Sequence, residues 1–344
     1  MKRRLLKSEE NIKMIKTTIY GLTKKELLQW FLDAGEKKFR ATQTWDWLYN
    51  KRAASFEAMT NLSKATIAKL TESFSFNPLT LVKEKEQQAA TDYSFQLADG
   101  ANITTTLMHH DYGLSAYVAS QADDDDERNL STGELVAQVV TLQHYLDEKE
   151  TDERISHIMV IGQEPLADLT SVLGFLKIVN DQAGLEIGAR HMTVTTNGLA
   201  DKIQRFANVD LQVNLAITLN APSNDLRSRL VPTNRDWSLD KLFNAVHFYV
   251  DRTNRRITFQ YVMLKDVNDQ PEDALQLVNL LKDIHHLAYV NLIPYQALED
   301  DSRYAASSRN RQLAFFDVLK KQGINTVIRN DYSPELMLAI KQLK

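Results

Sequence analysis

The chain has 344 residues, of which 43% are hydrophobic and 25% are charged, and it contains no cysteine. These fractions exclude wholesale disorder, collagen-like repeats and coiled coil. The missing cysteine excludes disulfides, thiolate zinc sites, a cysteine nucleophile and an iron–sulfur cluster held by four cysteines. The net charge of −4 is unevenly spread, because residues 1–70 carry 15 Lys and Arg against 7 Asp and Glu.

This basic amino-terminal region, joined to an acidic body, indicates a polyanionic partner for the first part of the chain. No apolar run approaches the roughly 20 residues that a transmembrane helix needs. The N-terminus is basic but has no apolar stretch after it, so it does not resemble a signal peptide. We therefore expect a cytoplasmic protein.

Residues 1–75 are predicted to form a small basic helical domain. Helical periodicity covers Leu22–Asp33 and Thr42–Asn50, and Ser63 provides an N-cap for a third helix over Lys64–Leu70. Basic and aromatic residues alternate here, which is typical of nucleic-acid binding, although a solvated charged face gives the same pattern. The candidate RNA-binding residues are Lys37, Lys38, Arg40, Lys51, Arg52 and Lys64.

Residues 76–112 are predicted to form a short antiparallel β connector. Alternating runs over Leu79–Lys85, Tyr93–Leu97 and Ile103–Met108 are separated by turn residues. Asp99-Gly100 is a strong signal for a hairpin turn between the second and third of these runs.

Residues 113–344 are predicted to form a full or partial β/α barrel, because strands and helices alternate from about residue 115. The active site of such a barrel lies at the carboxyl ends of the strands. The predicted strands are Ser115–Ser120, Ile155–Ile161, His191–Thr196, Leu211–Leu219, Arg256–Leu264, Ala288–Pro294 and Asn325–Ile328. The predicted helices include Thr132–Glu148, Asp168–Asp181, Leu239–Arg252, Glu272–Ile284 and Arg309–Gln322.

Two loops at these strand ends contain carboxylates. The acidic run 123–127 follows the first barrel strand, and it lacks the interleaved glycines of Ca²⁺ loops, which favours a solvated loop over a cation site. Glu164-Pro165 follows the second strand. A carboxylate fixed in this way can hold an ammonium group, but Glu-Pro also simply marks a strand–helix turn.

Two further strand ends carry small polar side chains, in Thr195-Thr196-Asn197-Gly198 and in Thr218 to Pro222. Such residues suit a polar ligand, and they also suit helix capping. The pairs His109-His110 and His285-His286 are adjacent, so in a strand their side chains point to opposite faces and cannot chelate one ion together. No metal site is predicted.

Ordered motifs over nearly the whole chain resemble those of the RlmN/Cfr family of radical S-adenosylmethionine enzymes, which methylate an adenine of 23S rRNA and, for RlmN, of certain tRNAs. The resemblance implies a partial (β/α)6-type barrel of the α/β class behind a helical amino-terminal domain. The matching stretches are Gly35 to Ala41 with Trp45 to Tyr49, Met59 to Lys64, Arg128-Asn129-Leu130 with Gly133-Glu134, Glu164-Pro165, Ile187 to Arg190, Asn214 to Ala216, Ala221-Pro222, Leu226 to Leu230 with Pro232 and Asn234-Arg235, Val267 to Asp269, and Val290 to Pro294.

The family holds a [4Fe–4S] cluster with three cysteines, C-x₃-C-x₂-C, in the loop after the first barrel strand. Here Ser120-Gln121 and Arg128 match the flanks of that loop, and only six residues lie between Gln121 and Arg128. The resemblance also implies that Ile340 occupies the position of the methyl-carrying cysteine and Tyr117 that of its partner. The sequence therefore predicts no catalytic residue and no [4Fe–4S] cluster.

The family's cofactor pocket is altered as well, since its G-x-G-E-P motif has Gln163 before Glu164. We expect no bound cofactor, or at most residual S-adenosylmethionine binding. The resemblance implies that the vestigial pocket consists of Glu164, Thr195, Thr218, Asn220 and Gln296.

From these observations we predict a catalytically inactive RlmN/Cfr-like homologue that binds structured RNA, such as ribosomal RNA or the ribosome, and is not an enzyme. One alternative is an RNA methyltransferase-like protein that retains S-adenosylmethionine binding. Another is a regulator that binds a basic protein partner through the acidic run 123–127.

Overall fold

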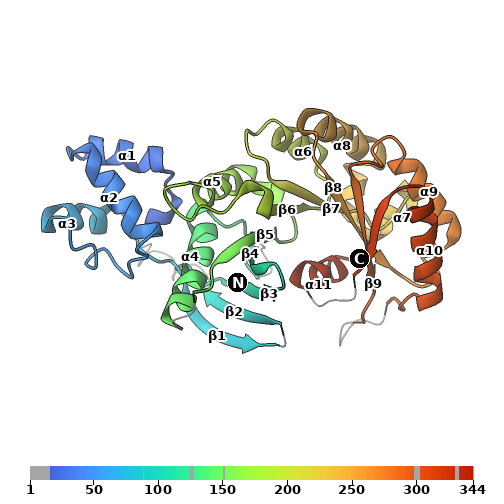
Figure 1. The fold of residues 1–344 in the computed structure, drawn as a ribbon, viewed down its shortest axis with the longest axis horizontal. Helices are drawn as coiled ribbons and strands as arrows, with labels where there is room; N and C mark the ends of the chain where they lie inside the picture. The colour runs from blue at the N-terminus through green and yellow to red at the C-terminus, as the bar shows by residue number, and fades with distance from the viewer. Residues whose placement is uncertain are drawn as a thin grey trace, which may run out of the picture.

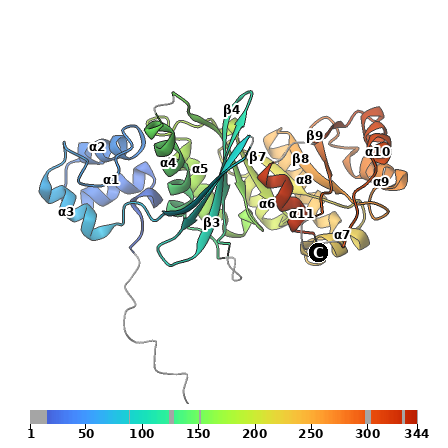
Figure 2. The ribbon, with the colours of Figure 1, turned by 90° about the horizontal axis from the view of Figure 1, so that it is seen from below.

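The structure is a computed structural model that describes residues 16–87, 89–123, 128–149, 152–297, 303–329 and 333–343. Three helices at the amino terminus lie at one end of the molecule, beside a large sheet with helices packed around it (Figures 1 and 2). No helix in the described ranges is long and apolar enough to cross a membrane.

The amino-terminal region contains the short turn η1 (Ile19–Gly21) and the helices α1 (Lys24–Asp33), α2 (Lys38–Tyr49) and α3 (Lys64–Ser73). Thr23 caps α1 in a capping box with Glu26, and the Ser63 hydroxyl caps α3. Each cap satisfies backbone N–H groups that lack helical partners, so it fixes where its helix begins. Trp45 and Tyr49 of α2 are buried, and their ring centroids lie 4.5 Å apart.

A single ten-stranded sheet runs in chain order from β1 to β10. Strands β1 to β4 pair antiparallel, and β4 to β10 pair parallel, so the predicted antiparallel connector leads directly into the barrel. Because β1 and β10 do not pair with each other, the barrel is open. The strands are β1 Thr80–Glu86, β2 Ala90–Gln96, β3 Asn102–His110, β4 Gly113–Ala119, β5 Ile155–Ile161, β6 Met192–Thr196, β7 Asn214–Thr218, β8 Ile257–Met263, β9 Ala288–Pro294 and β10 Asn325–Ile328.

Helices follow the parallel strands, as right-handed β/α units require. They are α4 Thr132–Glu148, α5 Leu169–Val179, α6 Ala200–Ala207, α7 Asn224–Leu230, α8 Leu239–Thr253, α9 Pro271–Leu281, α10 Arg309–Lys321 and α11 Pro334–Lys341, with short 3₁₀ turns η2 Pro165–Asp168, η3 Ala189–His191 and η4 Pro232–Arg235. The predicted α/β partial barrel, with its helical amino-terminal domain and antiparallel connector, is confirmed.

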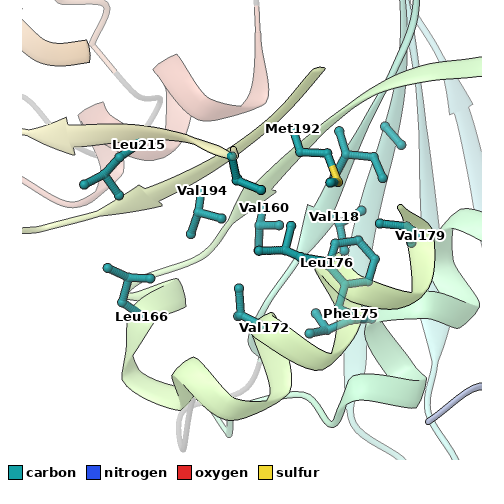
Figure 3. Close-up of a cluster of buried hydrophobic side chains, with 14 of the residues drawn as sticks. Val118, Val160, Leu166, Val172, Phe175, Leu176, Val179, Met192, Val194 and Leu215 are labelled. Carbon is teal, nitrogen blue, oxygen red and sulfur yellow. The ribbon is translucent and has the colours of Figure 1, made fainter. Parts of the chain in front are cut away.

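The main core lies between the sheet and its outer helices. Figure 3 shows Val118, Val160 and Val194 on the strands facing Val172 and Phe175 of α5, and all five side chains are at most 2% exposed. Burying each such side chain contributes about 1.5–3 kcal/mol. Since alternate residues of β5 point into this core, the other set, which includes His157 and Met159, faces the concave side of the sheet.

The last helix, α11, packs on that concave side. Ile340 and Leu343 belong to an apolar cluster with Val262 of β8 and Ile293 of β9. This cluster is separate from the main core, and α11 lies across the open barrel near the carboxyl ends of the strands (Figure 1).

Candidate functional site

Glu164 lies at the carboxyl end of β5, where the fold positions an active site. Its Oε2 accepts a hydrogen bond from Asn197 N at 2.8 Å, and its Oε1 accepts one from Leu166 N at 3.2 Å. Pro165 begins the turn η2 and thereby brings Leu166 N back toward the carboxylate. The half-buried carboxylate is therefore held in one orientation by two backbone N–H groups.

Burial raises the pKa of Glu164 to about 7. Hydrogen bonds from Thr196, Asn197 and Leu166 and the positive charge of Arg227 act in the opposite direction but do not overcome it. Such a carboxyl group is sensitive to any ligand charge near it, because a cation would restore its ionised form. The arrangement suits a small cationic ligand group.

Arg227 on α7 is completely buried behind the same strand ends. Its Nη2 donates to Asn197 O at 2.6 Å and to Thr218 O at 3.2 Å, and its Nη1 donates to Asn234 Oδ1 at 3.1 Å. Burial lowers its pKa to about 10, and the charge of Glu164 partly opposes this change. The guanidinium therefore joins the ends of β6 and β7 into one unit.

A cavity of about 10 Å³ remains between these strand ends and α11, which is room for about one water molecule. Gln342 closes it, because its Nε2 donates to Gly162 O at 2.9 Å and to Gln163 O at 3.2 Å. The lining residues are Gly162, Gln163, Thr195, Thr196, Asn197, Thr218 and Gln260 from the sheet side and Glu335, Leu338, Ala339 and Gln342 from α11 and its end.

Two of the predicted pocket residues, Thr195 and Thr218, line this cavity, and Glu164 lies next to it through its hydrogen bond with the lining residue Asn197. The Thr195 hydroxyl donates to Val160 O at 3.1 Å, and the Thr218 hydroxyl donates to Gln260 Oε1 at 3.4 Å. Both hydroxyls are therefore engaged within the sheet in this closed arrangement.

The other two predicted pocket residues lie elsewhere. Asn220 is buried, with a φ of 57°, and its Oδ1 accepts from Val262 N at 2.9 Å while its carbonyl accepts from Asn268 Nδ2 at 2.8 Å. It fastens the end of β7 to β8 and does not line the cavity. Gln296 is exposed beyond β9.

Sequence reasoning missed several residues that build the site. Asn197, Arg227 and Gln342 hold it together, although Asn197 lies in a strand end noted for its polar side chains and Arg227 in a stretch noted only for the family resemblance. Gln121 was also missed, and its Oε1 accepts from Glu164 N at 2.9 Å. Arg227 lies between Leu226 and Leu230, whose i, i+4 spacing indicates a buried helix face, and that spacing was the available signal for a buried cation.

The shortened loop after β4 is closed by backbone pairing. Gln121 and Asn129 form an isolated antiparallel bridge, and Ala122 N donates to Arg128 O at 3.0 Å. Of the acidic run, Asp123 accepts from the Thr104 hydroxyl at 3.0 Å. The remaining run, 124–127, lies outside the described residues.

The two positions that the resemblance assigned to cysteines are both buried. Ile340 lies in the apolar cluster beneath α11, and Tyr117 lies in a separate cluster with Met108 and Ala90. The described residues thus fill both positions with large side chains.

The predicted RNA-binding residues have different surroundings. Lys37, Lys38 and Lys64 are exposed. The Nη1 of Arg40 donates to Gln43 Oε1 and to Asn61 O, both at 2.8 Å.

Lys51 pairs with Asp46 at 2.8 Å, and its Nζ lies 4.4 Å from the centre of the Trp47 ring. Arg52 forms a two-point ion pair with Asp147 of α4, which ties the amino-terminal helices to the barrel. Among the predicted RNA-binding residues, the exposed Lys37, Lys38 and Lys64 are therefore the cations most accessible to a ligand.

The chain matches the ribosomal RNA large subunit methyltransferase N-terminal domain family over residues 17–75 and the radical SAM superfamily over residues 122–278. It is 48% identical to a probable dual-specificity RNA methyltransferase RlmN of Enterococcus faecalis, over 96% of this chain and 97% of that protein. A protein of the same name from Streptococcus thermophilus is 46% identical over 99% of this chain and 92% of that protein. The crystal structure of a radical SAM methyltransferase from Sphaerobacter thermophilus matches with a TM-score of 0.85 and 32% identity, covering 95% and 99% of the two chains.

These relatives contradict the prediction of a catalytically inactive homologue that is not an enzyme. The similarity runs through both matched regions at 46% to 48% identity, and the relatives are named as methyltransferases. The prediction of inactivity rested on the missing cysteines, and missing residues alone do not show whether a protein is active. The alternatives of a methyltransferase-like binder and a protein-binding regulator are not favoured by these matches either.

The prediction of no cofactor is also wrong, since the radical SAM superfamily and these relatives imply a [4Fe–4S] cluster and S-adenosylmethionine. The donor set of this chain does not fit a cluster held by thiolates, because the sequence contains no cysteine. Among the described residues, no group of three or more His, Asp or Glu side chains could hold a metal ion. We therefore derive no chemical step through a cluster. Glu164 and the strand ends do offer partners for S-adenosylmethionine.

Proposed function

The chain belongs to the RlmN family, and from this premise we propose that it acts on structured RNA as an RNA methyltransferase with S-adenosylmethionine as its ligand at the strand-end site. The observation that carries the proposal is the orientation of Glu164 within a full-length match to proteins named RNA methyltransferases. RNA is the substrate class in those names, and methyl transfer to RNA is the activity to be measured.

The proposed contact for S-adenosylmethionine is an ion pair between its amino group and the Glu164 carboxylate. A carboxylate already held by Asn197 N and Leu166 N pays little further ordering cost when it binds an ammonium group. Burial that raises the pKa of Glu164 also strengthens the attraction once the ligand cation is present. The hydroxyl-bearing residues Thr195 and Thr218 are further polar groups in the cavity lining.

Ligand entry requires α11 to withdraw. Pockets for ligands of this size have volumes of roughly 300 Å³ or more, and the closed cavity holds about 10 Å³. The helix is fixed by the Gln342 hydrogen bonds, by the apolar contacts of Ile340, and by an ion pair between Arg329 and Glu335 at 3.5 Å. The helix α11 thus covers the site as a lid that is held by few contacts. S-adenosylmethionine would occupy the space that α11 now fills.

For RNA, we propose the exposed cations of the amino-terminal region as the contact. Lys37, Lys38 and Lys64 are exposed, and Phe39, which follows Lys38 in the chain and carries the Arg40 guanidinium over its ring, is 49% exposed. Lysines next to an exposed ring provide both phosphate contacts and a stacking surface.

We keep the division into a helical domain (1–75), a β connector (76–112) and a barrel (113–344) as part of this proposal. The same holds for the ribosome as the source of the RNA and for the cytoplasm as the compartment. A protein partner at the acidic run 123–127 stays a prediction.

Equilibrium dialysis with radiolabelled S-adenosylmethionine tests the ligand site. Glu164→Gln keeps the shape but removes the charge, so we expect the affinity to fall about 10- to 100-fold, as expected for loss of an enclosed ion pair. Glu272→Gln, on the exposed start of α9, is the matched control and should bind as the wild type does. Equal affinity of all three proteins would exclude Glu164 as the ligand contact.

Transfer of label from S-adenosylmethionine to 23S rRNA transcripts and to tRNA tests the reaction class. We expect label in the RNA with the wild type and a loss with Glu164→Gln. A protein that binds the ligand and the RNA but transfers no label under aerobic or anaerobic conditions would contradict the proposed reaction, while the two binding sites would stand.

A further inference from the structure

The parallel strands have a second edge, formed by the residues at which β5 to β9 begin. Strand β5 covers Ile155–Ile161, and at about 3.3 Å per residue its start lies roughly 20 Å from its carboxyl end. Nothing in the strand-end site uses this amino edge. It nevertheless gathers arginine and aromatic side chains from five separate segments.

Two guanidinium groups meet at the amino edge around one neutral oxygen. Arg190 Nε donates to Gln212 Oε1 at 3.1 Å, and Arg255 Nη1 donates to the same oxygen at 3.4 Å. Arg255 Nη2 also donates to Asn214 Oδ1 at 2.7 Å. In the part of the chain that the structure describes, no carboxylate lies within the 4.0 Å salt-bridge distance of either group. Amides therefore orient both cations without a carboxylate partner, and the half-buried Arg255 also lies beside the Tyr249 hydroxyl.

The feature that sets this pair apart is the shared acceptor. Arg52 and Arg128 form ion pairs with carboxylates, and the buried Arg227 has separate neutral oxygens for its donors. Two guanidinium groups that share a neutral acceptor repel each other, and an anion between them would relieve that repulsion. Their planar N–H groups match the oxygens of a phosphate.

A row of four aromatic rings continues from the arginine pair. The ring of His191, next to Arg190 in the chain, lies 4.5 Å from that of His157, and His157 lies 4.7 Å from Tyr112. Tyr112 stacks on His110 at 4.6 Å with an interplanar angle of 10°. Tyr112 is 62% exposed, so part of its ring remains accessible to a ligand beside its contacts with His110 and His157.

Hydrogen bonds fix the order of this row. The Ser156 hydroxyl donates to Leu114 O at 3.2 Å, so its oxygen accepts from His157 Nδ1 at 2.8 Å. His157 Nε2 then accepts from His191 Nδ1, also at 2.8 Å. Burial and the neighbouring histidines lower the pKa of His157, which is consistent with this neutral acceptor. These hydrogen bonds therefore hold the row of aromatic rings in place before any ligand binds.

We propose that the amino edge is a second RNA contact, in which Arg190 and Arg255 bind a backbone phosphate and the exposed ring of Tyr112 stacks on a base. The inference rests on the proposed function for its choice of polyanion. Phosphate groups beside an unstacked base are the combination that a single-stranded RNA segment presents. The concave face of β5, with Met159 between the two edges, connects this contact to the strand-end site.

Filter binding of a 23S rRNA transcript to the full chain, over a series of salt concentrations, tests this contact. We expect Arg190→Ala/Arg255→Ala to weaken binding about 10-fold and to lower the slope of log affinity against log salt by about 1, as loss of one phosphate contact predicts. Tyr112→Ala should weaken binding about 5- to 100-fold while the salt slope stays unchanged, because stacking releases no counterions.

The control is Lys320→Ala/Lys321→Ala, which removes two positive charges from the exposed end of α10. It should bind RNA with an affinity within about 2-fold of that of the wild type, since it alters the net charge but no residue of the proposed amino-edge contact. Circular dichroism checks that each variant is folded. If both double variants weaken binding equally, or if Tyr112→Ala has no effect, the second contact is refuted. A wild-type protein that binds no RNA would instead refute the proposed function itself.

Discussion

The arginines at the two edges of the parallel sheet have opposite surroundings. At the carboxyl edge, Arg227 is completely buried, and its donors meet Asn197 O, Thr218 O and Asn234 Oδ1. At the amino edge, Arg190 is exposed, and it meets only an amide oxygen that it shares with Arg255. The first arginine stabilises the fold, whereas the exposed Arg190 is accessible to a partner and Arg255 lies half-buried beside it.

The contrast shows why charge alone is a poor guide to a binding site. A buried cation with fixed acceptors is costly to remove, because each acceptor would lose its partner in a place that water cannot reach. An exposed cation contributes little to folding, since water solvates it equally well in both states. Stability measurements and binding measurements should therefore separate the two edges cleanly.

The largest expected effect is that of Arg227→Ala. It removes three hydrogen bonds from the ends of β6 and β7, and we expect the free energy of unfolding to fall by about 3–5 kcal/mol. Urea unfolding followed by circular dichroism measures it. Arg229→Ala, two residues along the same helix and exposed, is the matched control and should change stability by less than about 0.5 kcal/mol. Arg190→Ala should resemble this control, and a loss as large as that of Arg227→Ala would break the comparison.

The second effect is a pH dependence that Glu164 at the carboxyl edge should produce. The pKa of Glu164 is about 7 in the folded protein against an ordinary value of 4.5, so the folded state binds the proton more tightly. Between these values folding takes up a proton, and stability therefore falls as the pH rises. The loss should be complete above about pH 8 and amount to roughly 3 kcal/mol.

Urea midpoints at pH 5 to 8 test this, with Glu164→Gln as the reference that cannot titrate. The difference in unfolding free energy between the wild type and this variant should fall steadily with pH. Arg190→Ala/Arg255→Ala should keep the wild-type slope, because its substitutions lie at the other edge. A difference that rises with pH would mean that the hydrogen bonds to the Glu164 carboxylate outweigh its burial.

The third effect concerns Gly162, which has no side chain because there is no space for one. An ideal Cβ there would lie 2.2 Å from Ser120 Oγ and 2.9 Å from Gln121 Oε1. We expect Gly162→Ala to lower the free energy of unfolding by about 1–3 kcal/mol, as overpacking does. In a thermal denaturation series, adding Ser120→Ala should restore at least half of the loss. An equal loss in the double variant would show that Ser120 is not the obstacle.

The sequence predicted those parts of the fold and of the site that depend on neighbouring residues, and it did not predict contacts between residues far apart in the chain. The strands Ile155–Ile161 and Ala288–Pro294 were predicted with their observed bounds, because buried apolar runs between turn residues are local signals. The helix Thr132–Glu148 was predicted for the same reason, and Ser131 and Glu134 cap it.

The candidate site was predicted only in part. Glu164, Thr195 and Thr218 come together because parallel strands end at one edge, whereas Gln296 is exposed although it was expected in the pocket. The role of Gln342 depends on a contact with Gly162, 180 residues away, which no periodicity encodes. The prediction of inactivity failed for another reason, since it was based on absent residues although the chain matches relatives named as RNA methyltransferases.

The smallest expected effect tests whether α11 is the lid of the closed edge. Gln342→Ala removes the two hydrogen bonds to Gly162 O and Gln163 O, which together contribute about 1 kcal/mol to the closed arrangement. Because S-adenosylmethionine needs the space that α11 fills, loosening the helix should raise ligand affinity about 5-fold while it lowers stability slightly. Gln204→Ala, on the exposed side of α6, is the control and should change neither value. Weaker ligand binding in Gln342→Ala would mean that Gln342 contacts the ligand, and α11 would then be part of the binding site instead of its cover.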